Sequence, residues 1–379
     1  MFLISKEPKA LDAFGFLLIE MDCKDSKIWD YDLKNGYKLY WASTKPSDNL
    51  SVFKDGFIIG KTDFEQAYSK TPYESKEDLL PDELNPLLNT FRLKTDTLNI
   101  EPNEQAIAYY ARQTVSDFSL LVALHNGLRP SDYGIGMLVA TGFFVGNDTL
   151  FNEIKRINYL NGLMISTSQE YQLFSFLPQK SNDDLLIQRY LDILPKGMNA
   201  AISMSGGMDS RFVLGLLVKK EIFPHVYSLD GDESDIVSEI CDKLGLGHEI
   251  QRFESMDPYL YTIRTDARIY SGGGHYHKMF RDSKPDEYIF NGLSSLATLK
   301  NAYKAVWKDF STNRSNVVER IIQVAYLGGV GAKIEGIELG KESLVKQYQS
   351  TLEPYTAMSE SLKKHEVTRF FHHVNGGMN

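Results

Sequence analysis

The sequence predicts a two-domain protein, with an N-terminal α+β domain over residues 1–180 and a C-terminal α/β domain with a parallel sheet over residues 181–379. Three observations support this prediction. The chain has 379 residues, more than one domain usually holds. The first 180 residues are rich in short apolar strand patterns, and after residue 199 such strands alternate with helical patterns. Strands that alternate with helices are typical of parallel sheets covered by helices.

In the N-terminal domain, apolar runs between turn residues predict strands. These predicted strands are 14–21, 37–43, 50–53, one that follows the turn in 55–62, and a hairpin of 162–166 and 171–176 around residues 168–170. Helical spacing of apolar residues predicts helices over about 104–126 and about 149–156. The polar stretch 178–184 is the predicted domain boundary, and a helix over residues 185–194 is expected after it.

In the C-terminal domain, the predicted order is strand 199–204, helix 210–220, strand 226–229, helix 234–244, strand 249–253 and strand 288–290. Gly245 is expected to end its helix, because glycine adopts the left-handed conformation of a helix end at little cost. Ligands of such sheets bind beyond the carboxyl ends of the strands. The residues after strand 199–204 are therefore the first candidates for a site.

Composition excludes several kinds of protein. Lys and Arg number 41 against 50 Asp and Glu, and the net charge of -9 argues against nucleic acid or an anionic membrane as partner. Two cysteines, Cys23 and Cys241, exclude a disulfide scaffold and a four-cysteine zinc site. The first residues become charged too early for a signal peptide, and the apolar run 14–19 is too short to span a bilayer. We therefore expect a cytoplasmic protein.

The segment 203–211, Ser-Met-Ser-Gly-Gly-Met-Asp-Ser-Arg, joins the first strand of the C-terminal domain to its helix. The glycine pair 206–207 leaves room for a ligand beside the backbone amides. The helix that follows adds free N–H groups and the positive end of its dipole. The hydroxyls of Ser205 and Ser210 are further donors. This combination predicts a phosphate site.

Asp209 is the unusual member of this segment, because a carboxylate repels phosphate. It fits if Mg²⁺ lies between them, since proteins hold Mg²⁺ through one or two carboxylates and phosphate oxygens. A plain glycine turn before a helix is the alternative interpretation. A Walker loop is excluded because its lysine and spacing are absent, and no third glycine completes a dinucleotide motif.

Residues 205–210, Ser-Gly-Gly-Met-Asp-Ser, resemble the S-G-G-x-D-S loop of the ATP pyrophosphatases, which form an adenylate from ATP and release pyrophosphate. Residues 228–249 look like the asparagine-synthetase segment that passes a G-x-x-S/P-D turn and ends in H-x-E/H. Residues 143–157 resemble the stretch that closes the glutaminase domain of that family. The resemblance covers about residues 55–300. It implies a C-terminal sheet like that of the adenine nucleotide α-hydrolases and an N-terminal degenerate Ntn-type glutaminase sandwich.

The resemblance also implies roles for single residues. Asp209 would bind Mg²⁺ and is, with Arg211, the expected catalytic residue. Arg211 would bond to phosphate or to a substrate carboxylate, with a plain surface arginine as the alternative. The residues expected to bind ATP are Ser205, Gly206, Gly207, Met208 and Ser210 at the pyrophosphate, and Ser203, Ser228 and Gly292 around the adenosine, largely through backbone groups.

The chain departs from the family at three places. Residue 2 is Phe where the family exposes a catalytic cysteine, and Cys23 lies inside the chain, so we expect no hydrolysis of glutamine. Residues 290–296 lack the acids of the family motif S-G-E-G-x-D-E, and Asp235 is only a candidate helper for the metal. Only residues 297–379 follow, so we expect either a shortened member of the family or a chain that is incomplete at its C-terminus.

These residues together predict an ATP-dependent ligase of the asparagine synthetase type, with ATP and Mg²⁺ as cofactors. Its expected partners are a small-molecule or peptide carboxylate and an amine donor, with a homodimer as one option and with no nucleic acid or membrane. One alternative is a cyclase or amidotransferase of a natural-product or polysaccharide pathway, as in the β-lactam synthetase and lasso-peptide cyclase branches that lack the cysteine. The other is a non-catalytic nucleotide-binding scaffold.

Overall fold

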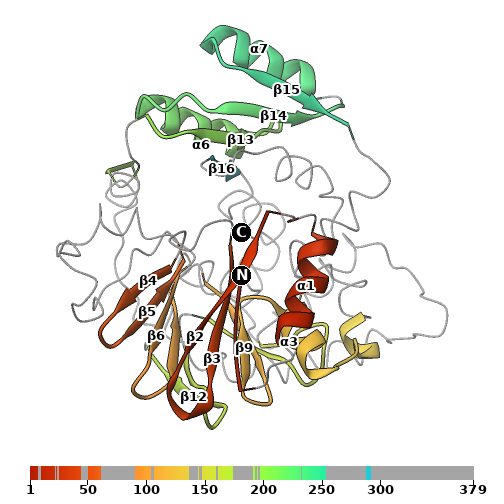
Figure 1. Cartoon of the computed structure of the whole chain (residues 1–379). Helices are drawn as coiled ribbons and strands as arrows, with labels where there is room; N and C mark the ends of the chain where they lie inside the picture. The colour runs from red at the N-terminus through yellow and green to blue at the C-terminus, as the bar shows by residue number, and fades with distance from the viewer. Residues whose placement is uncertain are drawn as a thin grey trace, which may run out of the picture.

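The structure is a computed structural model. It describes residues 1–6, 10–21, 23, 25–43, 50–60, 90–103, 106–135, 144, 147–158, 161–173, 191–192, 194, 197–231, 233–252 and 287–291. The predicted boundary at 178–184 and most of the helix predicted after it lie outside these residues. The described part contains a four-stranded parallel sheet and two six-stranded antiparallel sheets (Figure 1). The predicted parallel sheet of the C-terminal part is thus confirmed, and the strand-rich first half forms antiparallel sheets.

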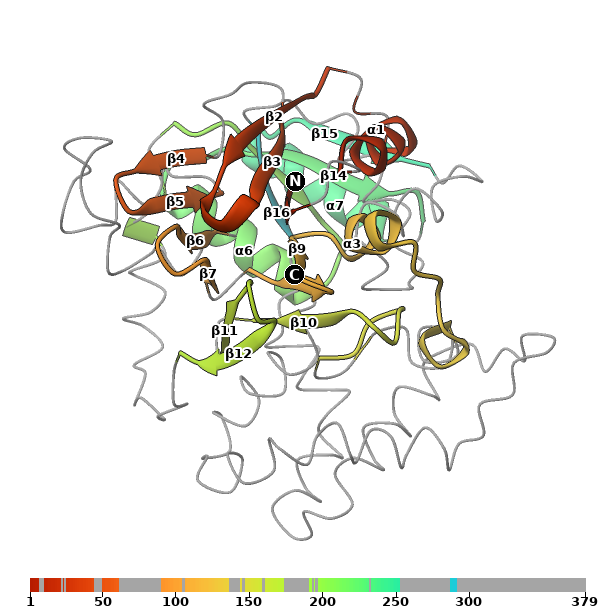
Figure 2. The same ribbon diagram turned by 60° about the horizontal axis from the view of Figure 1, so that its bottom comes forward.

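The two antiparallel sheets are built from the first half of the chain (Figure 2). Sheet A has the order β10 (Lys155–Ile157), β8 (Ala108–Ala111), β9 (Thr114–Ser116), β1 (Phe2–Ser5), β3 (Lys38–Ser43) and β2 (Lys27–Asp32). Sheet B has the order β12 (Gln169–Gln172), β11 (Asn161–Met164), β7 (Asn99–Pro102), β6 (Phe91–Lys94), β5 (Gly56–Ile59) and β4 (Leu50–Phe53). A short 3₁₀ helix, η1 (Lys34–Gly36), connects β2 to β3.

Sheet A is covered on both of its faces. Since side chains alternate along a strand, Phe2 and Ile4 of β1 join one buried cluster, which also contains sheet B residues such as Leu93. Leu3 of the same strand packs on the other side, in a cluster with Phe14. That second cluster is formed with the helices α1 (Ala10–Glu20) and α3 (Ser119–Asn126). The layers are therefore helices, sheet A and sheet B.

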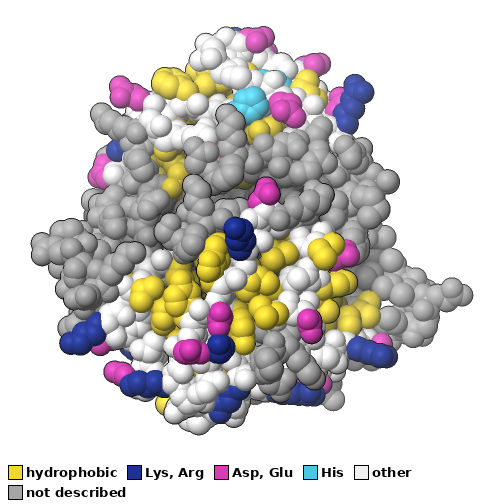
Figure 3. All heavy atoms as spheres, in the orientation of Figure 1, with side chains coloured by type: hydrophobic (Ala, Val, Ile, Leu, Met, Phe, Trp, Pro, Cys, Tyr) yellow, Lys and Arg dark blue, Asp and Glu magenta, His cyan; other side chains and the backbone are white. Residues whose placement is uncertain are grey.

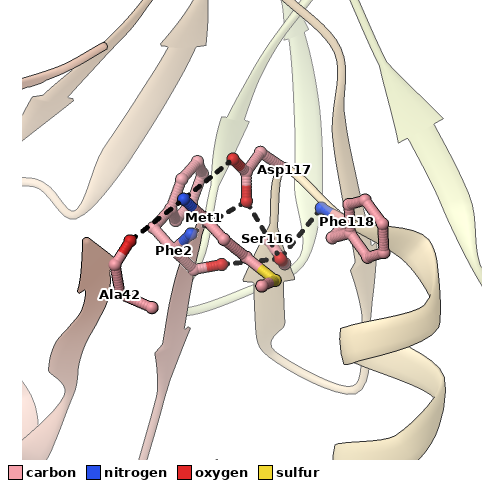
Figure 4. Close-up of polar contacts among 6 residues, drawn as sticks. All are labelled: Met1, Phe2, Ala42, Ser116, Asp117 and Phe118. Carbon is pink, nitrogen blue, oxygen red and sulfur yellow. Dashed lines mark hydrogen bonds and ion pairs between the residues drawn. The ribbon is translucent and has the colours of Figure 1, made fainter. Parts of the chain in front are cut away.

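Polar contacts hold the start of β1 in this position (Figure 4). The N–H of Phe2 donates to Oδ1 of Asp117 at 2.9 Å, and the buried hydroxyl of Ser116 donates to the Phe2 carbonyl at 2.6 Å. The amine of Met1 lies 3.9 Å from Oδ2 of Asp117. The N–H of Phe118 donates to the Ser116 hydroxyl oxygen at 2.9 Å. These bonds join β1 to the β9–α3 connection.

The parallel sheet has the order β15 (His248–Gln251), β14 (His225–Leu229), β13 (Ala200–Ser203) and β16 (Tyr288–Asn291). Two helices connect three of these strands, α6 (Met208–Lys219) between β13 and β14 and α7 (Ser234–Leu244) between β14 and β15. Both helices contribute to one buried cluster with Ile202 and Val226, so they cover the same face of the sheet. Ala201 and Tyr227 point to the opposite face.

Every strand and helix predicted in the C-terminal domain after residue 199 is confirmed, with shifts of up to two residues at its ends. Gly245 ends α7 in the left-handed conformation, with φ 65° and ψ 34°, as predicted. The strands predicted at 37–43, 50–53 and after the turn of 55–62 are confirmed as β3, β4 and β5. The predicted hairpin is β11 and β12, but its turn comes earlier, at residues 165–168.

Three predictions for the N-terminal domain are wrong. Residues 14–21, predicted as a strand, lie largely in α1, where Ala13, Phe14 and Leu17 form the buried face and Phe16 and Ile19 are exposed. The helix predicted over 104–126 is helical only in α3, because the residues before it form β8 and β9. The helix predicted over 149–156 is a series of turns leading into β10. The first two errors come from runs whose apolar residues do not follow one face: α1 also carries exposed apolar side chains, and residues 106–109 are all buried.

No helix among the described residues combines the length and the apolar character needed to cross a membrane. Hydrophobic side chains nonetheless gather on the surface of the part that carries the antiparallel strands (Figure 3). On α1, the exposed apolar side chains are Leu11, Phe16 and Ile19.

The two-sided burial of β1 leads to a test with a matched control. Phe2 has no exposed surface, and its ring lies edge-on to Phe91 with centroids 5.1 Å apart. We expect Phe2→Ala to lower the free energy of unfolding by about 3–5 kcal/mol, because it leaves a cavity between the sheets. Phe16→Ala, at a side chain that is 53% exposed, should cost less than about 1 kcal/mol. Urea unfolding measures both, and equal losses would contradict the assigned packing.

Candidate functional site

The predicted phosphate segment leaves the parallel sheet at the point where its strand order reverses. β13 pairs in parallel with β14 on one side and with β16 on the other. The chain after β13 is held against β14 by a bond from the N–H of Met204 to the carbonyl of Tyr227, at 2.8 Å. In open parallel sheets, such a reversal leaves a crevice beyond the carboxyl ends of the two strands. Residues 204–207 therefore begin at the edge where ligands of this fold class bind.

Two hydrogen bonds made by serines shape the loop between β13 and α6. The N–H of Gly207 donates to Oγ of Ser205 at 3.2 Å. The buried hydroxyl of Ser210, in the first turn of α6, donates back to the Ser205 carbonyl at 2.8 Å. Gly207 precedes α6 in an extended conformation and provides no side-chain cap. The amides of the loop and of the first helical turn thus lie at one end of α6, where its dipole favours an anion.

Glu233, which the sequence analysis did not single out, also contacts this loop. It lies in the turn after β14, and its Oε2 accepts a hydrogen bond of 2.8 Å from the N–H of Gly206. A Cβ on Gly206 would lie 3.1 Å from Cβ of Glu233 and 3.3 Å from Cδ1 of Ile236. Position 206 therefore suits glycine, because the turn that follows the neighbouring strand packs directly against it.

Two further side chains of the predicted segment, those of Met208 and Arg211, lie on α6. Met208, the first residue of α6, is 75% exposed. Arg211 is exposed, and its Nε–H donates to the carbonyl of Gly207 at 3.2 Å, so its side chain lies over the first turn beside the loop. Asp209 is the second residue of α6, and the structure describes its backbone but not its side chain.

Two of the three residues predicted around the adenosine lie on neighbouring strands, Ser203 on β13 and Ser228 on β14. Ser203, partly buried, is the last residue of β13 and pairs with Tyr227 of β14 and Asn291 of β16. Gly292, directly after β16, lies outside the described residues. The hydroxyl of Ser228 is buried and bonded to His248, so only backbone groups of Ser228 remain for a ligand.

His248 connects β14, β15 and α7. Its Nε2 lies 2.8 Å from Oγ of Ser228, and its Nδ1 lies 3.2 Å from Oγ of Ser238. Burial lowers the pKa of His248, and the neighbouring His225 adds to this effect, whereas Asp242 opposes it. A neutral imidazole therefore joins two strands and a helix just behind the candidate site. Only the three-dimensional pairing of β14 with β15 shows this role.

The described residues contain no group of three or more His, Cys, Asp and Glu side chains that could hold a metal ion. Asp235, the candidate helper, is exposed in the first turn of α7. The donors at the loop are backbone N–H groups and a serine hydroxyl, which suit an anion.

A separate cavity of about 400 Å³ lies at the opposite, amino edge of the parallel sheet. Its lining includes Ala200 at the start of β13, His225 at the start of β14, and Glu287 just before β16. Since parallel strands bring their amino ends to one edge, this cavity is separated from the loop 204–207 by the length of the strands. It is therefore not part of the candidate site.

A scan against protein-family models finds no match to the chain, and no curated protein matches its sequence. The resemblance of residues 205–210 to the ATP pyrophosphatases therefore depends on the residues themselves and on their position in the sheet.

The pKa of His248 gives a test of the contacts behind the site. Because its pKa is lower in the folded protein than the usual value of about 6.5, the folded state binds fewer protons at this position. The stability from His248 is present above pH of about 6.5 and is lost as the pH falls through the folded pKa. We expect the wild type to lose more thermal stability between pH 7.5 and 5 than His248→Gln, which keeps polar groups but does not titrate. Parallel losses in both proteins would show that His248 contributes no such pH dependence.

Proposed function

We propose that the chain is an ATP-dependent ligase of the asparagine synthetase type, which joins a carboxylate to an amine. The observation that carries the proposal is the position of the Ser-Gly-Gly-Met-Asp-Ser segment. It follows a strand of a parallel sheet at the reversal of strand order and continues into the first turn of α6. In such a reaction the carboxylate attacks the α-phosphate of ATP, which gives an acyl adenylate and releases pyrophosphate, and the amine then displaces AMP.

In the proposed site, the N–H groups of Gly206 and Gly207 and the hydroxyl of Ser210 would bind the pyrophosphate part of ATP. These donors would stabilise the negative charge that develops on the departing pyrophosphate when the α-phosphate is attacked, and the N-terminus of α6 adds its dipole. Asp209 would hold the Mg²⁺ that accompanies the phosphates. Arg211 lies close enough to the loop to contact a phosphate or the substrate carboxylate.

The residue at position 2 bears on where the amine of this reaction comes from. The side chain of residue 2 is a phenylalanine ring that is fully buried between the sheets, so this position offers no thiol nucleophile for the hydrolysis of glutamine. Free ammonia, or an amine already present on the substrate, would then attack the activated carboxylate. This supports the second candidate, a cyclase or amidotransferase that uses an amine other than glutamine.

A nucleotide-binding scaffold without catalysis is the remaining alternative. It is supported by the absence of the acids of the family motif S-G-E-G-x-D-E from residues 290–296, which contain Leu293 and Leu296 instead. Turnover separates it from the ligase. Pyrophosphate–ATP exchange that appears with some carboxylate supports the ligase. Mg-ATP that binds without any exchange across a broad set of carboxylates supports the scaffold.

The first test is calorimetric titration of Mg-ATP into the full chain. We expect metal-dependent binding to the wild type and at least about tenfold weaker binding to Asp209→Ala, because the loss of one charge-assisted contact has about this effect. Asp242→Ala is the control, since it removes the same charge from an exposed position near the end of α7.

Two results would contradict the proposal at different points. If the wild type binds no Mg-ATP, the proposed function is wrong. If the wild type and Asp209→Ala bind Mg-ATP equally, with Mg²⁺ required in both, only the role proposed for Asp209 is wrong. Unchanged thermal unfolding of the variant shows that the loss is local.

A further inference from the structure

We infer that Glu233 is an internal competitor for the phosphate site, so that ATP binds only when its carboxylate leaves the loop. This inference rests on the proposed function and adds a means of regulation to the same site. The contact that motivates it joins the N–H of Gly206 to Oε2 of Glu233 at 2.8 Å.

The contact is between two turns at the carboxyl edge of the parallel sheet. Gly206 follows β13, and Glu233 follows the adjacent strand β14. The aliphatic part of the Glu233 side chain lies against Gly206, since a Cβ there would be 3.1 Å from Cβ and 3.4 Å from Cδ of Glu233. The carboxylate is thereby directed at the N–H of Gly206.

Two other donors at the loop, the N–H of Gly207 and the hydroxyl of Ser210, also make hydrogen bonds within the protein. The N–H of Gly207 donates to Ser205, and the hydroxyl of Ser210 donates to the Ser205 carbonyl. Those two bonds are internal to the segment 205–210 and involve neutral acceptors. The bond of Gly206 differs from them, because its acceptor is an anion that comes from another turn.

A carboxylate and a phosphate are both anions that seek the same kind of donor. The single N–H of Gly206 cannot serve both at full strength, and two anions held at that distance repel each other. Glu233 therefore occupies the place that a phosphate oxygen would take. Binding of the nucleotide requires the side chain to rotate away, which its exposure to solvent permits.

We call the loop closed when Glu233 is bonded to Gly206 and open when it is not. If only molecules with an open loop bind ATP, the apparent dissociation constant equals the intrinsic one divided by the fraction of open molecules. A hydrogen bond to a charged group on an exposed surface favours the closed loop by roughly tenfold. Removal of the charge at position 233 should therefore increase affinity by about that factor.

The experiment titrates Mg-ATP and, separately, Mg-pyrophosphate into the full-length wild type, Glu233→Gln and Glu233→Ala. The glutamine keeps the packing against Gly206 and removes the charge, whereas the alanine removes the contact. Asp242→Asn is the matched control, because it removes one negative charge from an exposed position of α7 far from the loop in sequence. We expect both Glu233 variants to bind each probe about tenfold more tightly, with Asp242→Asn unchanged.

The outcomes separate this inference from the proposed function. Binding by the wild type with equal or weaker binding by both Glu233 variants overturns the competitor and leaves the proposed function in place. An equal gain in Asp242→Asn also overturns it, since the effect is then one of net charge. If neither the wild type nor the Glu233 variants bind either probe, the proposed function is wrong and the inference fails with it.

Discussion

The parallel pairing of β13 on both of its edges is the constraint on which the candidate site depends. One neighbour, β14, is reached through α6, and the other, β16, comes from much later in the chain. The chain must therefore leave β13 toward one side and return on the other. This places the loop 204–207 between two strand ends, where the amides of Gly206 and Gly207 bond to side chains and not to a strand. The glycines of the loop are useful only because the topology brings them there.

The same topology explains what the sequence could and could not predict about the site. Residues 203–211 were identified because a strand, a glycine pair and a helix start follow one another directly in the chain. Glu233 and His248 were not assigned their contacts, because each partner belongs to a neighbouring strand or the turn after it. Their separations of 27 and 20 residues from Gly206 and Ser228 carry no periodic signal. Such contacts follow from strand order, which local patterns do not contain.

Predictability of the fold also differs between the two parts of the chain. In the parallel sheet, short apolar strands and longer helices with one apolar face, such as α7, are easily told apart. In sheet A, residues 106–109 are all buried, because the sheet has a second sheet on one face and helices on the other. A strand buried on both faces shows no alternation, so the sequence pattern of these residues predicts a helix. In α1, the run from Phe14 to Ile19 is apolar on both its buried and its exposed side, which concealed the helical period.

The two-sided burial of β1 has a consequence for how its register is chosen. In a sheet with one face exposed to solvent, a slip of one residue moves the apolar side chains into water. The free-energy cost of exposing them fixes the alignment. In β1 such a slip would only exchange one apolar side chain for another, since Phe2, Leu3 and Ile4 are all fully buried. The alignment must then be selected by directional groups. The bonds from Phe2 to Asp117 and from Ser116 to the Phe2 carbonyl provide this selection, because a slip of one residue would turn these backbone groups away from their partners.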